Sequence, residues 1–196
     1  MSGESDEDRW NRRYREGAYA SRSHPSTYLV EQMQALGEAL GYAADVACGR
    51  GRNADFLSRH GYQVDAYDIS DVALSLAREH YPQASITWHK RDLLIDGLPA
   101  AASYDLVVVV RFIAEDLIRN LTQHLHPGGF VIIDEHLKWS GDEPLAGPAG
   151  DRFRMSPGVL LDWLQPLVVI DHYEGLVEEP DGQLAAVARA VARNPH

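Results

Sequence analysis

One stretch in the first third of the chain constrains the fold more than any other. A short apolar run leads into the sequence Asp45-Val-Ala-Cys-Gly-Arg-Gly-Arg-Asn-Ala54, and residues 53–60 then have a helical pattern that Gly61 closes. The run predicts a buried strand, the pair Gly49 and Gly51 a tight turn, and the residues after it a helix. Glycine at both places allows a positive φ and lets a ligand approach the backbone. We therefore expect a ligand at the N-terminus of this helix.

A second strand is predicted over residues 62–68, and it ends in a carboxylate, Asp68, 17 positions after Gly51. A carboxylate at the end of such a strand can accept hydrogen bonds from both hydroxyls of a ribose. Gly49 and Gly51, with Ala54 in the last place, also match the dinucleotide fingerprint. Asp45 argues against a dinucleotide, because a carboxylate inside a buried strand needs a cationic or hydrogen-bonding partner and would repel a pyrophosphate. It would attract an α-amino group, such as that of S-adenosylmethionine.

The residues 45–54, together with residues 61–68, resemble the class I S-adenosylmethionine-dependent methyltransferases, and within them the tellurite-resistance and thiopurine methyltransferase-like branch. The likeness runs from about Trp10 to the last strand, and Ala47 departs from it because many relatives carry a third glycine there. The resemblance implies S-adenosylmethionine as cofactor and S-adenosylhomocysteine as product. The residues that we expect to contact the cofactor are Tyr14, Asp45, Ala47, Cys48, Gly49, Gly51, Asn53, Asp68, Ile69, Asp92, Leu93 and Arg111.

Several roles are implied by the resemblance alone. Asp92 would meet the adenine amine, and Leu93 would supply a backbone contact. Residues 10–24 would form an N-terminal arm that covers the cofactor, with Tyr14 or Arg13 near its methionine end. Residues 138–154 form a long loop that contains Gly and Pro, and we expect either a lid or a disordered surface loop there.

The order of the remaining elements predicts the fold class. A helix is expected from Pro25 to Gly41 through Leu29, Met33, Leu36 and Leu40, and others at residues 70–80, 114–125 and 156–164. Strands are expected at residues 85–89, 104–110 and 130–134, with a turn at 126–129 before the last of these. A hairpin of residues 167–176 and 184–192 follows. This order predicts an α/β fold with a Rossmann-like, seven-stranded, mostly parallel sheet, helices on both faces and an antiparallel C-terminal hairpin.

The composition bounds the rest. A chain of 196 residues fits one domain, which we place at residues 10–196 after a disordered tail of residues 1–9. The net charge of −11 favours a small-molecule acceptor over nucleic acid, and Cys48, the single cysteine, excludes an intrachain disulfide and a multi-cysteine metal site. Because there is no apolar run of about 18 residues, we expect no membrane span. A single cysteine fits a reducing cytoplasm, where we expect the protein, and we expect no metal. The sequence leaves the oligomeric state open.

The resemblance implies a small acceptor such as a thiol, selenium or tellurium species. Because methyl transfer to such a soft anion needs little acid-base help, we assign no catalytic residue. Candidate bases for other acceptors are Asp134, Glu135, His136 and His24. Arg111, Arg152 and Arg154 could hold an anionic acceptor. Two other functions stay open: an NAD-dependent oxidoreductase, and a non-catalytic protein that binds S-adenosylmethionine.

Overall fold

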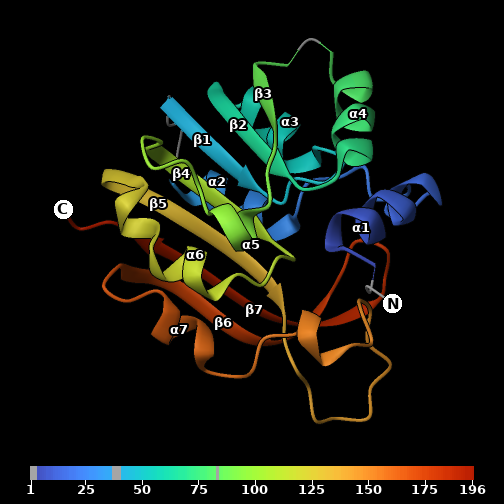
Figure 1. The fold of residues 1–196 in the computed structure, drawn as a ribbon. Helices are drawn as coiled ribbons and strands as arrows, with labels where there is room; N and C mark the ends of the chain where they lie inside the picture. Colours follow the sequence, from blue (N-terminus) through green and yellow to red (C-terminus); the bar gives the residue numbers. More distant parts are fainter. Residues whose placement is uncertain (1–3, 37–40, 83) are drawn as a thin grey trace.

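The computed structural model describes residues 4–36, 41–82 and 84–196. Within these residues, seven strands form one sheet in the order β3-β2-β1-β4-β5-β7-β6 (Figure 1). The strands are β1 (Gly41–Val46), β2 (Tyr62–Asp68), β3 (Ile86–Lys90), β4 (Tyr104–Val110), β5 (Leu125–His136), β6 (Val168–Glu178) and β7 (Leu184–Arg193). Strands β1 to β5 pair in parallel, whereas β7 is antiparallel to both β5 and β6. The predicted fold class is confirmed.

Helices cover both faces of the sheet because the central strands alternate apolar side chains between two cores. One core joins Leu106 and Val108 of β4 to α2 (Thr27–Leu36), α3 (Arg52–Arg59) and α4 (Asp71–His80). The other joins Val107 and Val109 to α5 (Leu93–Asp96), α6 (Glu115–Arg119) and α7 (Val159–Trp163). A buried parallel strand is expected to be apolar on both faces in this way.

The N-terminal helix α1 (Asp6–Arg15) lies beside α4, at the end of the sheet where the parallel strands finish (Figure 1). It begins at Asp6, earlier than the arm expected from residue 10. Ser5 caps the helix by accepting a hydrogen bond from Asp8 N. Three acidic residues in the first turn also stabilise the helix, because they interact favourably with the positive end of its dipole. The arm is therefore longer than the aromatic spacing alone indicated.

Strand β5 differs from the prediction. We expected a turn at residues 126–129 and a strand from Phe130, but β5 starts at Leu125 and continues to His136. Tyr104 pairs with Leu125 and Leu106 with Phe130, so the residues between them bulge out of the ladder. Gly128, with φ +81°, supplies the left-handed residue of this bulge.

Several helices are shorter than their apolar patterns suggested. The helix expected over residues 114–125 divides into α6 and the 3-10 turn η1 (Leu121–Gln123), and α7 covers five residues of the expected 156–164. Helix α2 is described only to Leu36, so the Leu40 end of the expected helix lies outside the described residues. Among the described residues, no helix is both long enough and apolar enough to cross a membrane.

Candidate functional site

The cavity of interest lies at the carboxyl ends of β1, β2 and β4, where open α/β sheets bind their ligands. Ten of the twelve residues expected to contact a cofactor line it. These are Tyr14, Ala47, Cys48, Gly49, Asn53, Asp68, Ile69, Asp92, Leu93 and Arg111. The parts of the sequence that were singled out separately thus come together in one place.

The turn after β1 is held in a left-handed conformation. Ala47, Gly49 and Gly51 have φ values of +54°, +56° and +81°. The turn is tied to β2 by a hydrogen bond from Cys48 N to Tyr67 O, 2.8 Å long. A Cβ atom on Gly49 would lie 2.7 Å from Tyr14 Oη, so glycine allows the arm to close over the turn.

Asp45 and Gly51 lie outside the described lining of the cavity. Both carboxylate oxygens of Asp45 are buried without a hydrogen-bond partner among the described residues, and burial raises the pKa of Asp45 to about 7. A Cβ on Gly51 would collide with the Trp88 ring, so this glycine is needed for packing and for the turn. Neither residue touches the cavity space directly.

Ala47 occupies a conformation that costs an L-residue about 1 to 2 kcal/mol. Replacing it by glycine should remove that cost. Part of the gain in stability is offset, because glycine has more conformational entropy than alanine in the unfolded chain. We expect Ala47→Gly to raise stability by about 0.5 to 1 kcal/mol, or roughly 1 to 4 °C in Tm. Thermal unfolding measures it. The matched control is Ala54→Gly inside α3, which should lower the free energy of unfolding by about 1 kcal/mol. If both variants lose a similar amount of stability, Ala47 is not strained.

Asp68 is the polar centre of the cavity. Its Oδ2 accepts a hydrogen bond from Gly49 N and its Oδ1 one from Ser70 N, each 2.8 Å long. Burial raises the pKa of Asp68 to about 6, while these backbone donors act in the other direction. The carboxylate therefore ties the turn after β1 to the start of α4 and keeps lone pairs for a ligand.

The arm is docked by a residue that the sequence analysis missed. Asn11 Oδ1 accepts hydrogen bonds from Ser70 Oγ (2.7 Å) and Val72 N (3.2 Å), at the N-terminus of α4. Lys90 adds ion pairs to Glu7 and Asp71. A polar residue between the aromatic Trp10 and Tyr14, on the inner face of α1, was the available signal.

The arm and the 138–154 loop meet at the cavity. Trp10, Arg13, Tyr14, Tyr19 and Arg22 line it from the arm, and Pro148 and Phe153 line it from the loop. The Arg9 guanidinium lies 5.9 Å from the Phe153 ring. Arg154 holds the loop by donating to the carbonyls of Leu137, Ala146 and Pro148.

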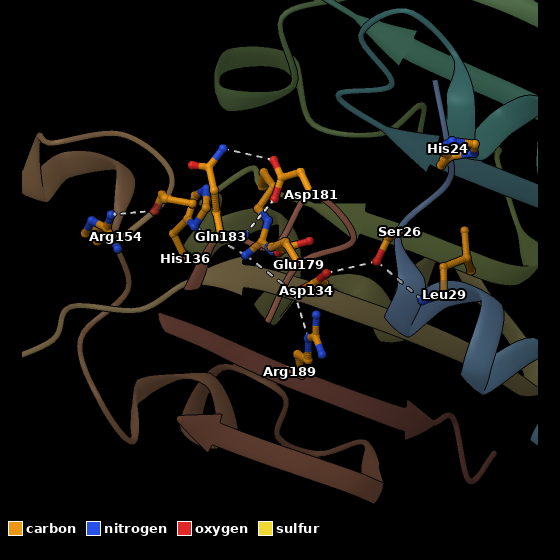
Figure 2. A network of polar contacts seen from close by, with 12 residues as sticks. His24, Ser26, Leu29, Asp134, His136, Arg154, Glu179, Asp181, Gln183 and Arg189 are labelled. Atoms are coloured by element: carbon orange, nitrogen blue, oxygen red, sulfur yellow. Dashed lines mark hydrogen bonds and ion pairs between the residues drawn. The ribbon is translucent and has the colours of Figure 1, made fainter. Parts of the chain in front are cut away.

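Next to the cavity, a network of charged side chains lies at the end of β5 (Figure 2), and Arg111 of this network also lines the cavity. Asp134 accepts from Arg189 Nε (3.0 Å) and Ser26 Oγ (2.9 Å), and Arg111 lies 3.5 Å away. Burial opposes ionisation, yet the two arginines hold the pKa of Asp134 below its usual value. Arg111 also donates to Glu179 at 2.6 Å, so its charge is already balanced.

Breaking this network should cost stability. Arg189→Met leaves Asp134 buried with fewer partners, and we expect a loss of about 2 kcal/mol because Arg111 and Ser26 remain. Urea unfolding at neutral pH measures it. Arg193→Met on the same strand is the control, since Arg193 is exposed and should change stability by less than about 0.5 kcal/mol. Equal losses for both variants would rule out the network as a source of stability.

The four candidate bases lie in different environments. Asp134 is ion-paired, and His24 accepts a hydrogen bond from Arg52 through its backbone oxygen. Glu135 is buried outside the described cavity lining, and burial raises its pKa to about 8. Only His136, of these four described residues, lines the cavity.

The comparisons with known proteins agree with this geometry. Residues 43–129 match the family model described as a methyltransferase domain. A probable S-adenosyl-L-methionine-dependent methyltransferase TehB from Haemophilus influenzae is 26% identical over 96 residues, which cover 45% of this chain and 34% of that protein. Hemagglutinin 1 of Eikenella corrodens is 28% identical over 153 residues, covering 71% and 48%. The chain thus spans from about a third to half of the length of these curated relatives.

Solved structures share the fold over nearly the whole chain. The crystal structure of TehB from Haemophilus influenzae gives a TM-score of 0.70 at 20% identity and covers 95% of this chain and 66% of that one. The N-methyltransferase NodS from Bradyrhizobium japonicum, in complex with S-adenosyl-L-homocysteine, gives 0.66 at 18% identity and covers 98% and 94%. Residues 43–129 thus match a methyltransferase domain, and the chain as a whole has the fold of the class I S-adenosylmethionine-dependent methyltransferases.

Proposed function

We propose that this chain transfers a methyl group from S-adenosylmethionine to a small-molecule acceptor with a soft or ionised nucleophilic atom. The observation that carries the proposal is the Asp68 carboxylate. It faces the cavity while it anchors Gly49 N and Ser70 N. A ribose that donates to this carboxylate would lay the rest of the cofactor along the turn of residues 47–51.

Each predicted contact then has a place along the cofactor. Asp92 and Leu93 line the cavity beyond Ile69 and would bound the adenine. Tyr14 and Asn53 would lie near the methionine end, since Tyr14 Oη faces Gly49 and Asn53 lies in the first turn of α3. When bound, S-adenosylmethionine would supply the methyl group from its sulfonium. The residues of this chain would bind and orient the cofactor and the acceptor, and they would exclude water.

A small acceptor is supported by the closure of the cavity. Aromatic and proline side chains of the arm and the loop border it, and the chain carries a net charge of −11, which disfavours nucleic acid. The environments of the candidate bases support a soft or ionised acceptor. Among the described residues, Asp134 at the end of β5 is ion-paired, and no free carboxylate from this strand end lines the cavity. Alignment of donor and acceptor would then supply most of the rate enhancement, up to about 7 to 11 kcal/mol.

Thermal unfolding with S-adenosylhomocysteine tests the proposal. At about 100 times its dissociation constant the ligand should add about 2.7 kcal/mol, or roughly 5 to 10 °C in Tm. NAD at the same concentration should give no shift. A shift with NAD alone would contradict the proposal and favour hydride transfer. If S-adenosylhomocysteine binds but no acceptor in a broad screen is methylated, the chain is a binding protein without this activity.

A further inference from the structure

The cavity is basic although the chain is acidic. Six arginines line it, namely Arg13, Arg22, Arg50, Arg52, Arg91 and Arg111. Three carboxylates line it, namely Asp6, Asp68 and Asp92. A chain of net charge −11 has thus gathered an excess of positive charge at one place. Such an excess raises the local concentration of anions.

Most of this positive charge has no partner of opposite sign. Arg111 pairs with Asp134 and Glu179, but within residues 4–36, 41–82 and 84–196 none of the other five lining arginines pairs with a carboxylate. Arg52 and Arg91 donate to backbone carbonyls, which carry no net charge. S-adenosylmethionine itself has one carboxylate against an ammonium and a sulfonium, so it brings a net positive charge. The cofactor alone therefore leaves the cavity with unbalanced positive charge.

Arg13 and Arg22 are oriented by aromatic rings. The Arg13 guanidinium lies 5.1 Å from the Trp10 ring centroid and 5.8 Å from that of Tyr19. Arg22 lies 5.7 Å from the Tyr19 ring. Cation-π contact holds a guanidinium without using up its N–H donors. The same rings give this part of the cavity an aromatic wall.

His136 adds a neutral donor. Its Nδ1 lies 3.4 Å from an Arg111 nitrogen, and a guanidinium can only donate, so Nδ1 accepts and the ring proton sits on Nε2. Burial, with Arg111 and Arg154 nearby, lowers the pKa of His136 to about 3. Asp134 and Arg22 are the other charged groups that act on the ring. In this tautomer the imidazole offers a hydrogen and has no free lone pair for a proton.

We propose that Arg13, Arg22 and His136 form an acceptor subsite that selects a small aromatic anion, which binds already deprotonated. The inference rests on the proposed function. In the transfer, a lone pair of the anion forms the bond to the methyl carbon, and the carbon–sulfur bond breaks with its electron pair remaining on sulfur. The sulfonium becomes a neutral thioether and the anion a neutral product. No proton is taken up or released, so His136 is not required as a base.

Binding of matched probes tests the subsite. The full chain is first saturated with S-adenosylhomocysteine and then titrated calorimetrically with benzoate, benzamide and benzylammonium, which share the ring and differ in charge. We expect benzoate to bind at least 10-fold more tightly than benzamide, and benzylammonium to bind least. Equal affinities, or tightest binding of the cation, would overturn the inference. If S-adenosylhomocysteine itself does not bind, the proposed function fails instead.

Variants assign the effect to residues. Arg13→Gln and Arg22→Gln should each reduce the benzoate affinity about 10-fold and leave benzamide unchanged. Arg15→Gln is the control, because Arg15 lies on the same helix as Arg13, is exposed and is absent from the described cavity lining. An equal loss for Arg15→Gln would mean a long-range effect of charge and no subsite.

The role of His136 has its own readout. His136→Gln keeps an N–H donor and should retain the benzoate affinity, whereas His136→Leu should reduce it. The difference in benzoate affinity between the original chain and His136→Gln should be independent of pH between 6 and 8, because His136 stays neutral throughout, whereas titration of Asp68 or Asp45 affects both proteins alike. Affinity that rises as the pH falls through this range, and does so only while His136 is present, would show a protonated imidazole and contradict the assignment.

Discussion

Replacing Asp68 by alanine is expected to weaken the binding of S-adenosylhomocysteine at least about 100-fold. A hydrogen bond to a charged group contributes about 1.5 to 3 kcal/mol, and the substitution removes two that we propose to the ribose. It also releases Gly49 N and Ser70 N, which the carboxylate holds in the free protein. Isothermal titration measures the dissociation constant, with circular dichroism as the check on folding.

The control for this experiment lies on the same strand. Asp65 is also a carboxylate of β2, but it bonds to Tyr104 and His89 and is absent from the described cavity lining. Asp65→Ala should therefore leave the affinity within about threefold of the original. If Asp68→Ala binds S-adenosylhomocysteine as tightly as the unmodified chain, the ribose is not at this carboxylate and the proposed orientation of the cofactor is wrong.

The stability of the protein without ligand is expected to fall as the pH rises from about 4.5 to 8, and Glu135 is the largest single cause. Burial raises the pKa of Glu135 from 4.5 to about 8. Between these values the folded state keeps a proton that the unfolded state has lost, so stability declines through this window. Asp45 and Asp68, whose pKa values burial raises to about 7 and about 6, act in the same direction. His136, whose pKa burial lowers from 6.5 to about 3, opposes them below about pH 6.5 without outweighing the three carboxyl groups.

Glu135→Gln should remove the Glu135 part of this dependence. The amide keeps an acceptor for Phe112 N, which donates to Glu135 Oε1 at 2.7 Å, and it never ionises. At pH 9 the variant should be more stable than the original by about 5 kcal/mol, and at pH 4 the two should be similar. Urea unfolding across this range measures the difference. Glu31→Gln, at an exposed position of α2, is the control and should leave the pH dependence unchanged.

A contrary result for Glu135 would also be clear. If the Glu135→Gln variant and the original show the same slope of stability against pH, Glu135 is ionised or solvated in the folded state. The dependence would then be due to the two carboxylates near the cavity, Asp45 and Asp68. Saturation with S-adenosylhomocysteine would change that dependence, whereas it would leave the Glu135 contribution in place.

Local signals predicted much of the fold. Strands β2 and β4 have the bounds expected from their apolar runs, and α4 begins after Ser70, which caps it through Ala73 N as the sequence indicated. These elements are determined by residues close in the chain. The bulge in β5 was not predictable in this way, because Pro127 and the two glycines after it read equally well as a turn. Which of the two forms depends on the pairing of β5 with β4.

The candidate site was predictable where its residues follow strand ends, and less so where distant side chains meet. Arg111 pairs with Glu179, 68 positions away, and Asp134 with Arg189, 55 positions away. No spacing rule couples residues so far apart. From the sequence we expected that Arg111, Arg152 and Arg154 could hold an anionic acceptor. Arg111 and Arg154 are engaged within the protein, however, and Arg152 is absent from the described cavity lining.

The position of β7 has a consequence for the order in which the sheet assembles. β7 follows β6 in the chain but is inserted between β6 and β5, and its five alanines are fully buried there. Alanine is a poor strand former, so β7 depends on both neighbours. Until the β6–β7 hairpin docks, the β5 edge stays open along Phe130 to His136, and its first four residues are apolar. An open apolar edge invites pairing with other chains. The interval before docking is therefore when this protein is most exposed to aggregation.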